Sequence, residues 1–339
     1  MKNSLYVIIM FITTLSWAHP GEHYVPRQAG TLLDDGEIIT QTPYLFEFET
    51  YKQFTQHQYS LGMNKQQIDQ LLPFDKFTQY QANHTVQVTE IIYRSAATNI
   101  AGLIFTPKGN TSKLLPIIIY NHDGYLRNAK ISFSEIIELY RLAEQGYVVM
   151  ASYFRGNGNS DGRADFTLGD VTDAYNLTMV AAKNIKQANI DKVGILGLGR
   201  GGTTAYHMAF HNDSYDAAIM MAAPTDYSTS HQLNHLDKHV FPYAVRHYKQ
   251  DKKAALIRIS PLKQIQHLNR QLPILLLHGT QDNQVLVSDS LNMATALNKQ
   301  SQVYRMAIFE QTNHTFDTQI LKLRSEIDYW FNKYLKSET

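Results

Sequence analysis

From about Val86 to the C-terminus, short runs of β-branched and apolar residues alternate with longer stretches of helical periodicity. This alternation is typical of a mostly parallel sheet that is covered by helices on both faces. Most of the strand runs are continuously apolar, as expected for strands that are buried on both sides. The pattern therefore predicts one α/β domain over residues 86–339.

The sequence predicts eight strands and five main helices in this domain. Strands are expected at 88–94, 100–106, 115–121, 147–153, 193–198, 217–222, 274–278 and 303–309, and helices at 132–145, 171–186, 202–210, 288–297 and 318–334. The stretch 228–268 interrupts the alternation between two late strands. It is the natural place for a lid over the C-terminal edge of the sheet.

The first 85 residues have a different character. Lys2 precedes an apolar run from Leu5 to Ile12, and Ser16 and Ala18 are small residues of the kind a signal peptidase reads. Residues 1–18 are therefore predicted to be a signal peptide, because the run is too short to span about 30 Å of hydrocarbon. Export to a periplasm or to the medium is expected. Residues 19–85 show no strand alternation. One short helix is predicted at 65–72, and no function is assigned to this segment.

Composition narrows the range of partners. The formal net charge is +1 and no lysine or arginine run stands out, so nothing indicates binding to nucleic acid or to an anionic membrane. The chain has no cysteine, which excludes disulfides, thiolate metal sites and cysteine nucleophiles. A small-molecule or peptide ligand is expected, no cofactor is predicted, and the oligomeric state is not indicated.

A predicted strand runs into a glycine-rich turn and then a helix. The segment Gly197-Leu198-Gly199-Arg200-Gly201 stands in the strand-turn-helix context of a nucleophile elbow, G-x-S-x-G. Gly197 and Gly201 are needed because side chains in so tight a turn would strike the neighbouring strand and helix. The central residue of such a turn normally aims a hydroxyl at the substrate from a strained backbone. Here it is Gly199, which has no side-chain oxygen.

Two later loops carry a carboxylate and an imidazole. Asp282 follows the predicted strand 274–278 and His314 follows 303–309, so both are expected at the carboxyl ends of strands, where open α/β sheets bind ligands. The order of nucleophile position, acid and histidine is that of α/β-hydrolases. Asp282 would orient the imidazole and stabilise its charged form. An oxyanion hole would use the amides of Arg200 and Gly124.

Three further motifs accompany the elbow. Residues 154–162 resemble the arginine-glycine loop of the prolyl oligopeptidase family, 259–262 resemble its S-P-hydrophobic segment, and 278–285 resemble its acid loop. From about residue 88 to the end, the chain resembles the catalytic domain of that family and is also close to dienelactone-hydrolase-type esterases. The resemblance implies an α/β-hydrolase fold and serine hydrolysis of peptides or esters. It also implies that Asp282 is the triad acid, His314 the triad histidine and the Arg200 amide an oxyanion-hole donor. The chain departs from the family at Gly199, and residues 19–85 are too short to form the family's usual N-terminal propeller.

Gly199 leaves two functions open. In the first, the chain is a catalytically impaired or non-catalytic homologue that binds peptide-like or ester-like ligands, or a partner-binding module. In the second, it is a slow hydrolase in which His314 activates a water in place of the hydroxyl. A third reading is that glycine is an engineered or allelic change in an ordinary serine hydrolase. Four other hydroxyls could stand in for the serine but lack the geometry of the elbow: Ser152, Ser160, Thr203 and Thr204.

Two binding motifs compete weakly with this interpretation. Gly197, Gly199 and Gly202 fit the dinucleotide fingerprint G-x-G-x-x-G, but the next strand carries no acid for a ribose hydroxyl. His231, His235 and His239 have the spacing of ligands on one helical face. Among 14 histidines such spacing arises by chance, and no metal is predicted.

Overall fold

The computed structural model describes residues 34–109, 113–125, 129–166, 168–229 and 235–336. These residues belong to one compact unit, Thr31–Thr339. The predicted signal peptide, residues 1–18, and the following residues up to 33 lie outside the described residues. Within the described part of the chain, no helix is both long enough and apolar enough to span a bilayer.

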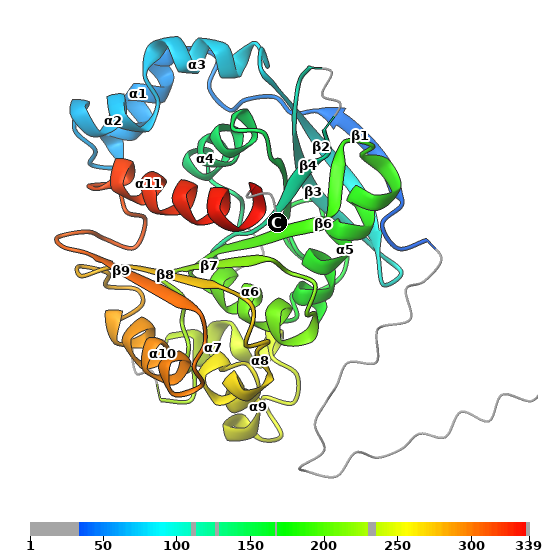
Figure 1. Cartoon of the computed structure of the whole chain (residues 1–339), viewed down its shortest axis with the longest axis vertical. Coiled ribbons are helices and arrows are strands. Elements are labelled where there is room, and N and C mark those ends of the chain that lie inside the picture. The colour runs from blue at the N-terminus through cyan, green and yellow to red at the C-terminus, as the bar shows by residue number, and fades with distance from the viewer. Residues whose placement is uncertain (1–33, 110–112, 126–128, 167, 230–234, 337–339) are drawn as a thin grey trace, which may run out of the picture. The chain divides into compact units, whose positions relative to one another are not determined.

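The described residues form a nine-stranded sheet in the spatial order β1-β2-β3-β5-β4-β6-β7-β8-β9 (Figure 1). Its strands are β1 Ile38–Pro43, β2 Val86–Ser95, β3 Thr98–Pro107, β4 Leu115–Asn121, β5 Val148–Ser152, β6 Ala188–Leu198, β7 Ala217–Met221, β8 Ile274–Gly279 and β9 Tyr304–Phe309. The six strands from β5 to β9 in this order run parallel, whereas β1, β2, β3 and β5 pair antiparallel. The predicted mostly parallel α/β sheet is confirmed.

The predicted number of strands is wrong by one. All eight predicted strands are present as β2 to β9, but β1 pairs antiparallel with β2 in a region where the sequence predicts no strand. Five of the six β1 residues are exposed, so the strand has no buried face to impose alternation on its sequence. Backbone pairing at the edge of the sheet therefore determines this strand, and that pairing leaves no side-chain pattern.

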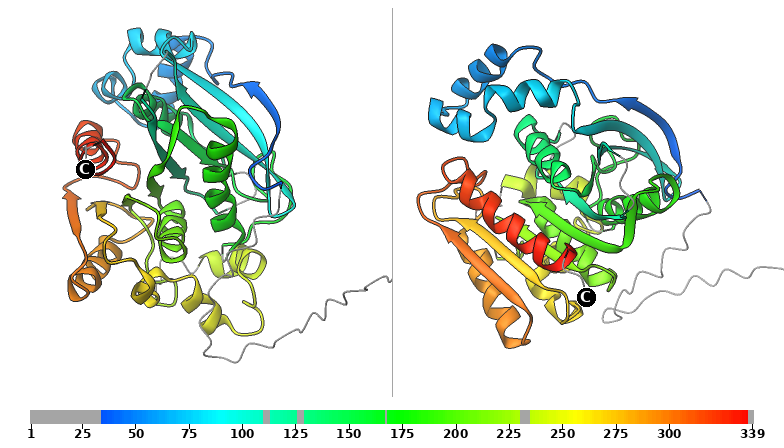
Figure 2. Two further views of the ribbon diagram at one scale, coloured as in Figure 1. Left: turned by 45° about the vertical axis from the view of Figure 1, so that its right-hand side comes forward. Right: turned by 45° about the horizontal axis from the view of Figure 1, so that its top comes forward.

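Helices cover both faces of the sheet (Figures 1 and 2). The helices are α1 Tyr51–Ser60, α2 Lys65–Leu71, α3 Phe74–Gln81, α4 Phe133–Glu144, α5 Gly169–Asn184, α6 Arg200–His211, α7 Leu236–His239, α8 Phe241–Ala244, α9 Lys252–Arg258, α10 Val287–Lys299 and α11 Ile320–Phe331, with 3₁₀ turns at Pro261–Lys263 and Ile265–His267 and a π-helical turn at Asn332–Lys336. The five main predicted helices and the short helix at 65–72 are present, and α1 and α3 are additional. The segment expected as a lid holds α7, α8 and α9.

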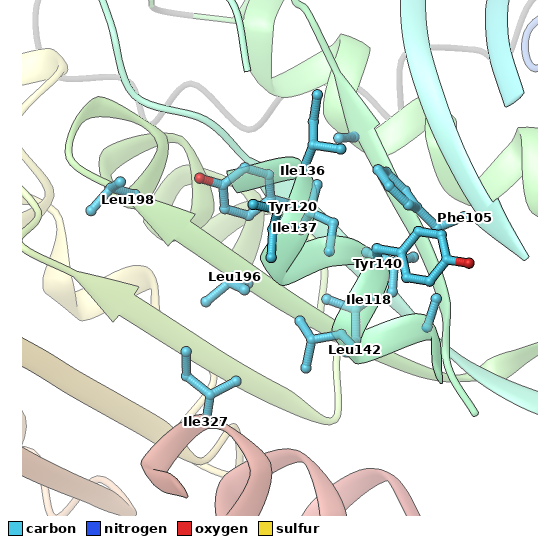
Figure 3. Close-up of a cluster of buried hydrophobic side chains, with 14 of the residues drawn as sticks. Phe105, Ile118, Tyr120, Ile136, Ile137, Tyr140, Leu142, Leu196, Leu198 and Ile327 are labelled. Carbon is cyan, nitrogen blue, oxygen red and sulfur yellow. The ribbon is translucent and has the colours of Figure 1, made fainter. Parts of the chain in front are cut away.

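Alternate residues of the strands point into two separate cores. On β6, Leu196 packs with the side chains of α4 and α11, whereas Ile195 packs with those of α5, α6 and α10. Figure 3 shows Leu196 and Leu198 opposite Ile327 of α11 and residues of α4. Each fully buried aliphatic side chain of this kind contributes about 1.5–3 kcal/mol. The two cores fix the sheet rigidly, so the loops at its carboxyl edge have defined positions.

The three N-terminal helices are fixed against α4 and α11. Both α1 and α2 begin with a capping box, formed by Thr50 and by Asn64, which satisfies amides that would otherwise lack partners. Arg324 of α11 donates hydrogen bonds of 2.7 Å to the carbonyls of Gln70 and Leu71 at the end of α2, and its guanidinium also pairs with Glu138 of α4. A cation at a helix C-terminus is favourable. Helices α1, α2 and α3 therefore cover part of α4 and α11.

Candidate functional site

The turn between β6 and α6 has the close packing that the sequence predicts. A Cβ atom built on Gly197 would lie 2.3 Å from the carbonyl oxygen of Gly201, and one built on Gly201 would lie 2.0 Å from that of Asn121. Only glycine fits at these two positions. Gly199 immediately precedes α6 with φ +53° and ψ −123°, a conformation that side chains adopt only with strain.

The expected partners Asp282 and His314 lie next to each other. His314 Nδ1 donates a hydrogen bond of 2.6 Å to Asp282 Oδ2. The other carboxylate oxygen of Asp282 accepts the amides of Gln284 and Val285 at 2.8 and 2.9 Å, and His278 Nε2 lies 3.3 Å from Oδ2. These contacts orient the carboxylate, and the carboxylate in turn orients the imidazole.

A second carboxylate lies on the other side of the imidazole. Asp123, in the loop after β4, places its Oδ2 atom 3.3 Å from His314 Nε2, and its Oδ1 atom accepts the amide of Arg200 at 2.8 Å. The sequence predicts that this loop contributes only backbone amides. Asp123 comes shortly after the end of β4, but no local pattern in the sequence indicates that its side chain is directed toward residue 199.

The Asp123 carboxylate occupies the space of a side chain at position 199. A Cβ atom built on Gly199 would lie 2.3 Å from Asp123 Oδ1 and 2.4 Å from Cγ, far inside van der Waals contact. Glycine at 199 and aspartate at 123 are therefore complementary. The hydrogen bond that His314 Nε2 would make to a residue at 199 is made to Asp123 instead.

The two carboxylates hold a proton on His314. Burial by itself would lower the pKa of His314, but its hydrogen bonds to Asp123 and Asp282 and their negative charges outweigh burial and raise this pKa to about 9. For both aspartates burial alone would raise the pKa. Hydrogen bonds from His278 and His314 outweigh burial at Asp282 and lower its pKa below the usual range. Hydrogen bonds from His314 and from the amides of Arg200 and Gly124 do the same for the pKa of Asp123. At neutral pH the group is carboxylate, imidazolium, carboxylate, with net charge −1.

The Arg200 side chain ties the two loops of the site together. It is almost fully buried, its Nη1 lies 2.5 Å from Asp170 Oδ2, and its guanidinium lies over the rings of Phe154 and Phe166. Its Nε donates to the carbonyl of Gly124 at 2.5 Å. Gly124 and Arg200, the two residues expected to form an oxyanion hole, are thus fixed beside each other, and both of their amides are directed at the Asp123 carboxylate.

The other candidate hydroxyls make structural hydrogen bonds. Ser152 Oγ accepts from Tyr93 and from the Phe154 amide, and Ser160 Oγ accepts from the Ala101 amide. The threonines on α6 donate to backbone carbonyls, Thr203 to Pro224 and Thr204 to Arg200.

The histidines with possible metal spacing are not all described. His231 lies outside the described residues, His235 caps α7 and His239 ends it. Among the side chains that the structure describes, no cluster of three or more histidine, aspartate or glutamate residues has the arrangement of a metal site.

A cavity of about 550 Å³ begins at the polar group. Asp123 and His314 line it, together with apolar side chains of the sheet, of α4 and of α11 and with residues of α1 and α2. Its volume lies in the usual range for small-molecule sites.

Comparisons with known proteins give the ancestry of this arrangement. Residues 131–338, more than half of the chain, match the model of the prolyl oligopeptidase family. The chain is 21% identical over 293 residues to the uncharacterised peptidase YuxL of Bacillus subtilis, covering 82% of this chain and 43% of that protein. It is 25% identical over 226 residues to dipeptidyl-peptidase 5 of Porphyromonas gingivalis, covering 62% and 32%. The chain thus spans less than half the length of these relatives.

Solved structures show the same fold. An acylaminoacyl peptidase of Pyrococcus horikoshii superposes with a TM-score of 0.66 at 20% identity, over 78% of this chain and 44% of that one. A putative dienelactone hydrolase of Klebsiella pneumoniae superposes with a TM-score of 0.55 at 18% identity, over 74% of this chain and all of that one. The predicted α/β-hydrolase fold is confirmed, and the chain belongs to the prolyl oligopeptidase family.

Proposed function

We propose that this chain is an exported homologue that binds peptide-like or ester-like ligands and has lost serine-type cleavage of them. One observation carries the proposal: the Asp123 carboxylate fills the space of a side chain at 199 and accepts the Arg200 amide. No acyl-enzyme can form at Gly199, since glycine has no nucleophilic atom. An oxyanion would also have to displace a carboxylate from its donors, which is costly in a buried site.

The geometry disfavours hydrolysis by a water that His314 activates. A general base must be able to accept a proton, but His314 Nε2 faces Asp123 and the pKa of His314 is raised to about 9. At neutral pH the imidazole already carries both protons. Direct water activation would therefore require His314 to lose a proton that two carboxylates stabilise.

The geometry also disfavours a dinucleotide at Gly197, Gly199 and Gly202. A pyrophosphate would have to bind at the N-terminus of α6. The first amide of that helix, Arg200 N, is taken by the Asp123 carboxylate, whose charge would repel a phosphate. Export rests on the sequence alone: a basic residue, a short apolar run and small residues near a cleavage position.

The test restores the missing parts one at a time. The native chain, Gly199→Ser and the double variant Gly199→Ser/Asp123→Gly are assayed with p-nitrophenyl esters and a fluorophosphonate probe. We expect no burst and no labelling for the native chain or for the single variant, because Asp123 collides with a side chain at 199. The double variant should give both. Binding of aminoacyl amides to the native chain is measured by calorimetry.

Two results would count against the proposal. Fluorophosphonate labelling of the native chain would reveal a working serine elsewhere. An absence of any calorimetric binding of peptide amides or esters would remove the ligand-binding role.

A further inference from the structure

The Asp123 carboxylate is accessible from the cavity. A quarter of its side chain is exposed to solvent, whereas the Asp282 side chain is fully buried behind His314. Both Asp123 and His314 line the cavity. A molecule bound there can therefore reach one oxygen of Asp123 and the Nε2 edge of the imidazole, and cannot reach Asp282.

Beyond this polar end the cavity is lined by apolar side chains of the sheet, α4 and α11, and also by polar side chains, among them Gln58, Gln67 and Glu138. The apolar lining includes Leu196 of β6, Met221 of β7, Leu142 of α4 and Ile327 of α11. Figure 3 shows Leu142, Leu196 and Ile327 directed toward one space. The distance along α11 from Ile320 to Ile327 is about 10 Å at 1.5 Å per residue. The space suits an aliphatic chain of about this length.

The carboxylate itself is placed as a nucleophile would be. Its Oδ1 atom is held by the Arg200 amide and its Oδ2 atom lies 3.3 Å from His314 Nε2. Carboxylates serve as covalent nucleophiles in enzymes. Attack on an acyl carbon would give a reactive anhydride, whereas attack on a saturated carbon gives a stable ester. We propose that Asp123 opens terminal epoxides carried on an aliphatic chain, with His314 acting first as acid and then as base.

The first step forms an ester on Asp123. Oδ2 attacks the terminal carbon of the epoxide, and the bond from that carbon to the ring oxygen breaks. The ring oxygen takes the proton from His314 Nε2, which gives a hydroxyalkyl ester and a neutral imidazole. An epoxide fits this step better than an alkyl halide, because the departing oxygen needs the proton that His314 holds beside the attacking atom.

The second step consumes water and restores the site. His314 Nε2 takes a proton from a water whose oxygen attacks Cγ of Asp123. The Arg200 amide, 2.8 Å from Oδ1, stabilises the oxyanion that develops there. The alkoxide leaves with the proton from His314, and the new carboxylic acid returns its proton to the imidazole. The sum is epoxide plus water giving a vicinal diol.

The two carboxylates explain how His314 changes roles. While Asp123 is charged, it and Asp282 together hold the proton on His314 and raise its pKa. Esterification removes the charge of Asp123, so one of the two groups that hold the proton is lost. The imidazole can then act as a base. This inference goes beyond the proposed loss of serine-type cleavage, since it concerns a different bond.

The test uses the full chain and racemic 1,2-epoxyoctane. Octane-1,2-diol is measured by mass spectrometry, and a single turnover is run in H₂¹⁸O. We expect one ¹⁸O atom in the peptide that contains Asp123, because water attacks Cγ. Asp123→Asn should lower diol formation to the rate without protein. Asp191→Asn, which changes an exposed carboxylate at the opposite end of β6, should keep the native rate.

A second pair of variants tests the cavity. Leu323→Trp places a large ring among the cavity side chains of α11 and should lower kcat/KM by about tenfold or more. Leu321→Trp, on the same helix but 52% exposed, should leave kcat/KM unchanged.

The outcomes separate this inference from the proposed ligand-binding role. Label found only in the diol would show direct attack by water and would overturn the role of Asp123. Calorimetric binding of peptide amides with no diol formation would overturn the epoxide reaction alone. Diol formation without binding of amides would overturn only the peptide-like ligand.

Discussion

The loops after β8 and β9 have the arrangement expected of a hydrolase, whereas the loops after β4 and β6 depart from it. Asp282 and His314 pair at 2.6 Å behind the site. In front of it, glycine stands at 199 and a carboxylate from residue 123 fills the space beside it. The half that orients the imidazole thus follows the pattern expected of a hydrolase, and the half formed by residues 123 and 199 does not.

This difference concerns the side chains of the site and leaves the sheet and its loops in the arrangement expected of the fold. His314 Nε2 and the amide of Arg200 both donate to an acceptor. This acceptor is the charged carboxylate of Asp123, in the loop after β4, and not a residue at 199. A buried imidazole with one carboxylate is poised to change protonation near neutral pH, whereas one between two carboxylates stays protonated. The predictions below separate the contributions of the two carboxylates.

The two aspartates should differ most in their effect on stability. Asp282→Ala leaves the imidazolium with one partner and removes the acceptor of two loop amides in a fully buried place. We expect a loss of about 3–5 kcal/mol in the free energy of unfolding. Asp123→Ala should cost about 1–2 kcal/mol, because water can reach the vacated position.

Urea unfolding at pH 7 measures both values, and Asp191→Ala serves as the exposed control, with a change within about 0.5 kcal/mol. A larger loss for Asp123→Ala than for Asp282→Ala would reverse the comparison.

The sequence predicts the pair of Asp282 and His314 and misses the position of Asp123 beside Gly199. Asp282 and His314 follow buried strands whose apolar runs are unmistakable, so their meeting at one edge follows from the topology. Asp123 also follows such a strand. Its role depends on the direction of one side chain toward a glycine 76 residues later in the chain, and no local pattern encodes that.

The same distinction applies to the fold. The eight strands and five main helices of the sheet domain are visible because burial imposes a period on their residues. The exposed edge strand β1 lacks such a period. Helices α1 and α3 bury residues at helical spacing, Phe54 and Gln58 on α1 and Phe77 and Tyr80 on α3, but each carries only two of them. These three elements are determined by pairing with β2 and by packing on α4, and contacts of this kind are visible only in three dimensions.

The protonated imidazole should make stability depend on pH. The pKa of His314 is raised to about 9 in the folded chain from its ordinary value of 6.5, so the folded state binds the proton more tightly. This contribution is fully present below about pH 6.5 and is lost as the pH rises through about 9, by up to about 3 kcal/mol. Urea unfolding between pH 6 and 10 measures it.

The two carboxylates can be separated in the same experiment. Asp123→Asn removes one of the charges that hold the proton, so the loss of stability should begin at lower pH and be smaller. An unchanged pH profile in this variant would mean that Asp282 alone holds the proton on His314.

The complementarity of positions 123 and 199 should appear as a coupling energy. Gly199→Ala introduces a Cβ atom that would lie 2.3 Å from Asp123 Oδ1 and adds a side chain at a positive φ. In the Asp123→Gly background the clash disappears and only the strain of the backbone remains. The cost of Gly199→Ala in the free energy of unfolding should therefore be smaller in that background, by about 1–2 kcal/mol.

Gly62→Ala, at an open position with φ +88°, is the control. Its cost reflects backbone strain alone and should not depend on residue 123. If the cost of Gly199→Ala is the same with aspartate and with glycine at 123, the carboxylate does not occupy the space of a side chain at 199, and residues 123 and 199 are independent of each other.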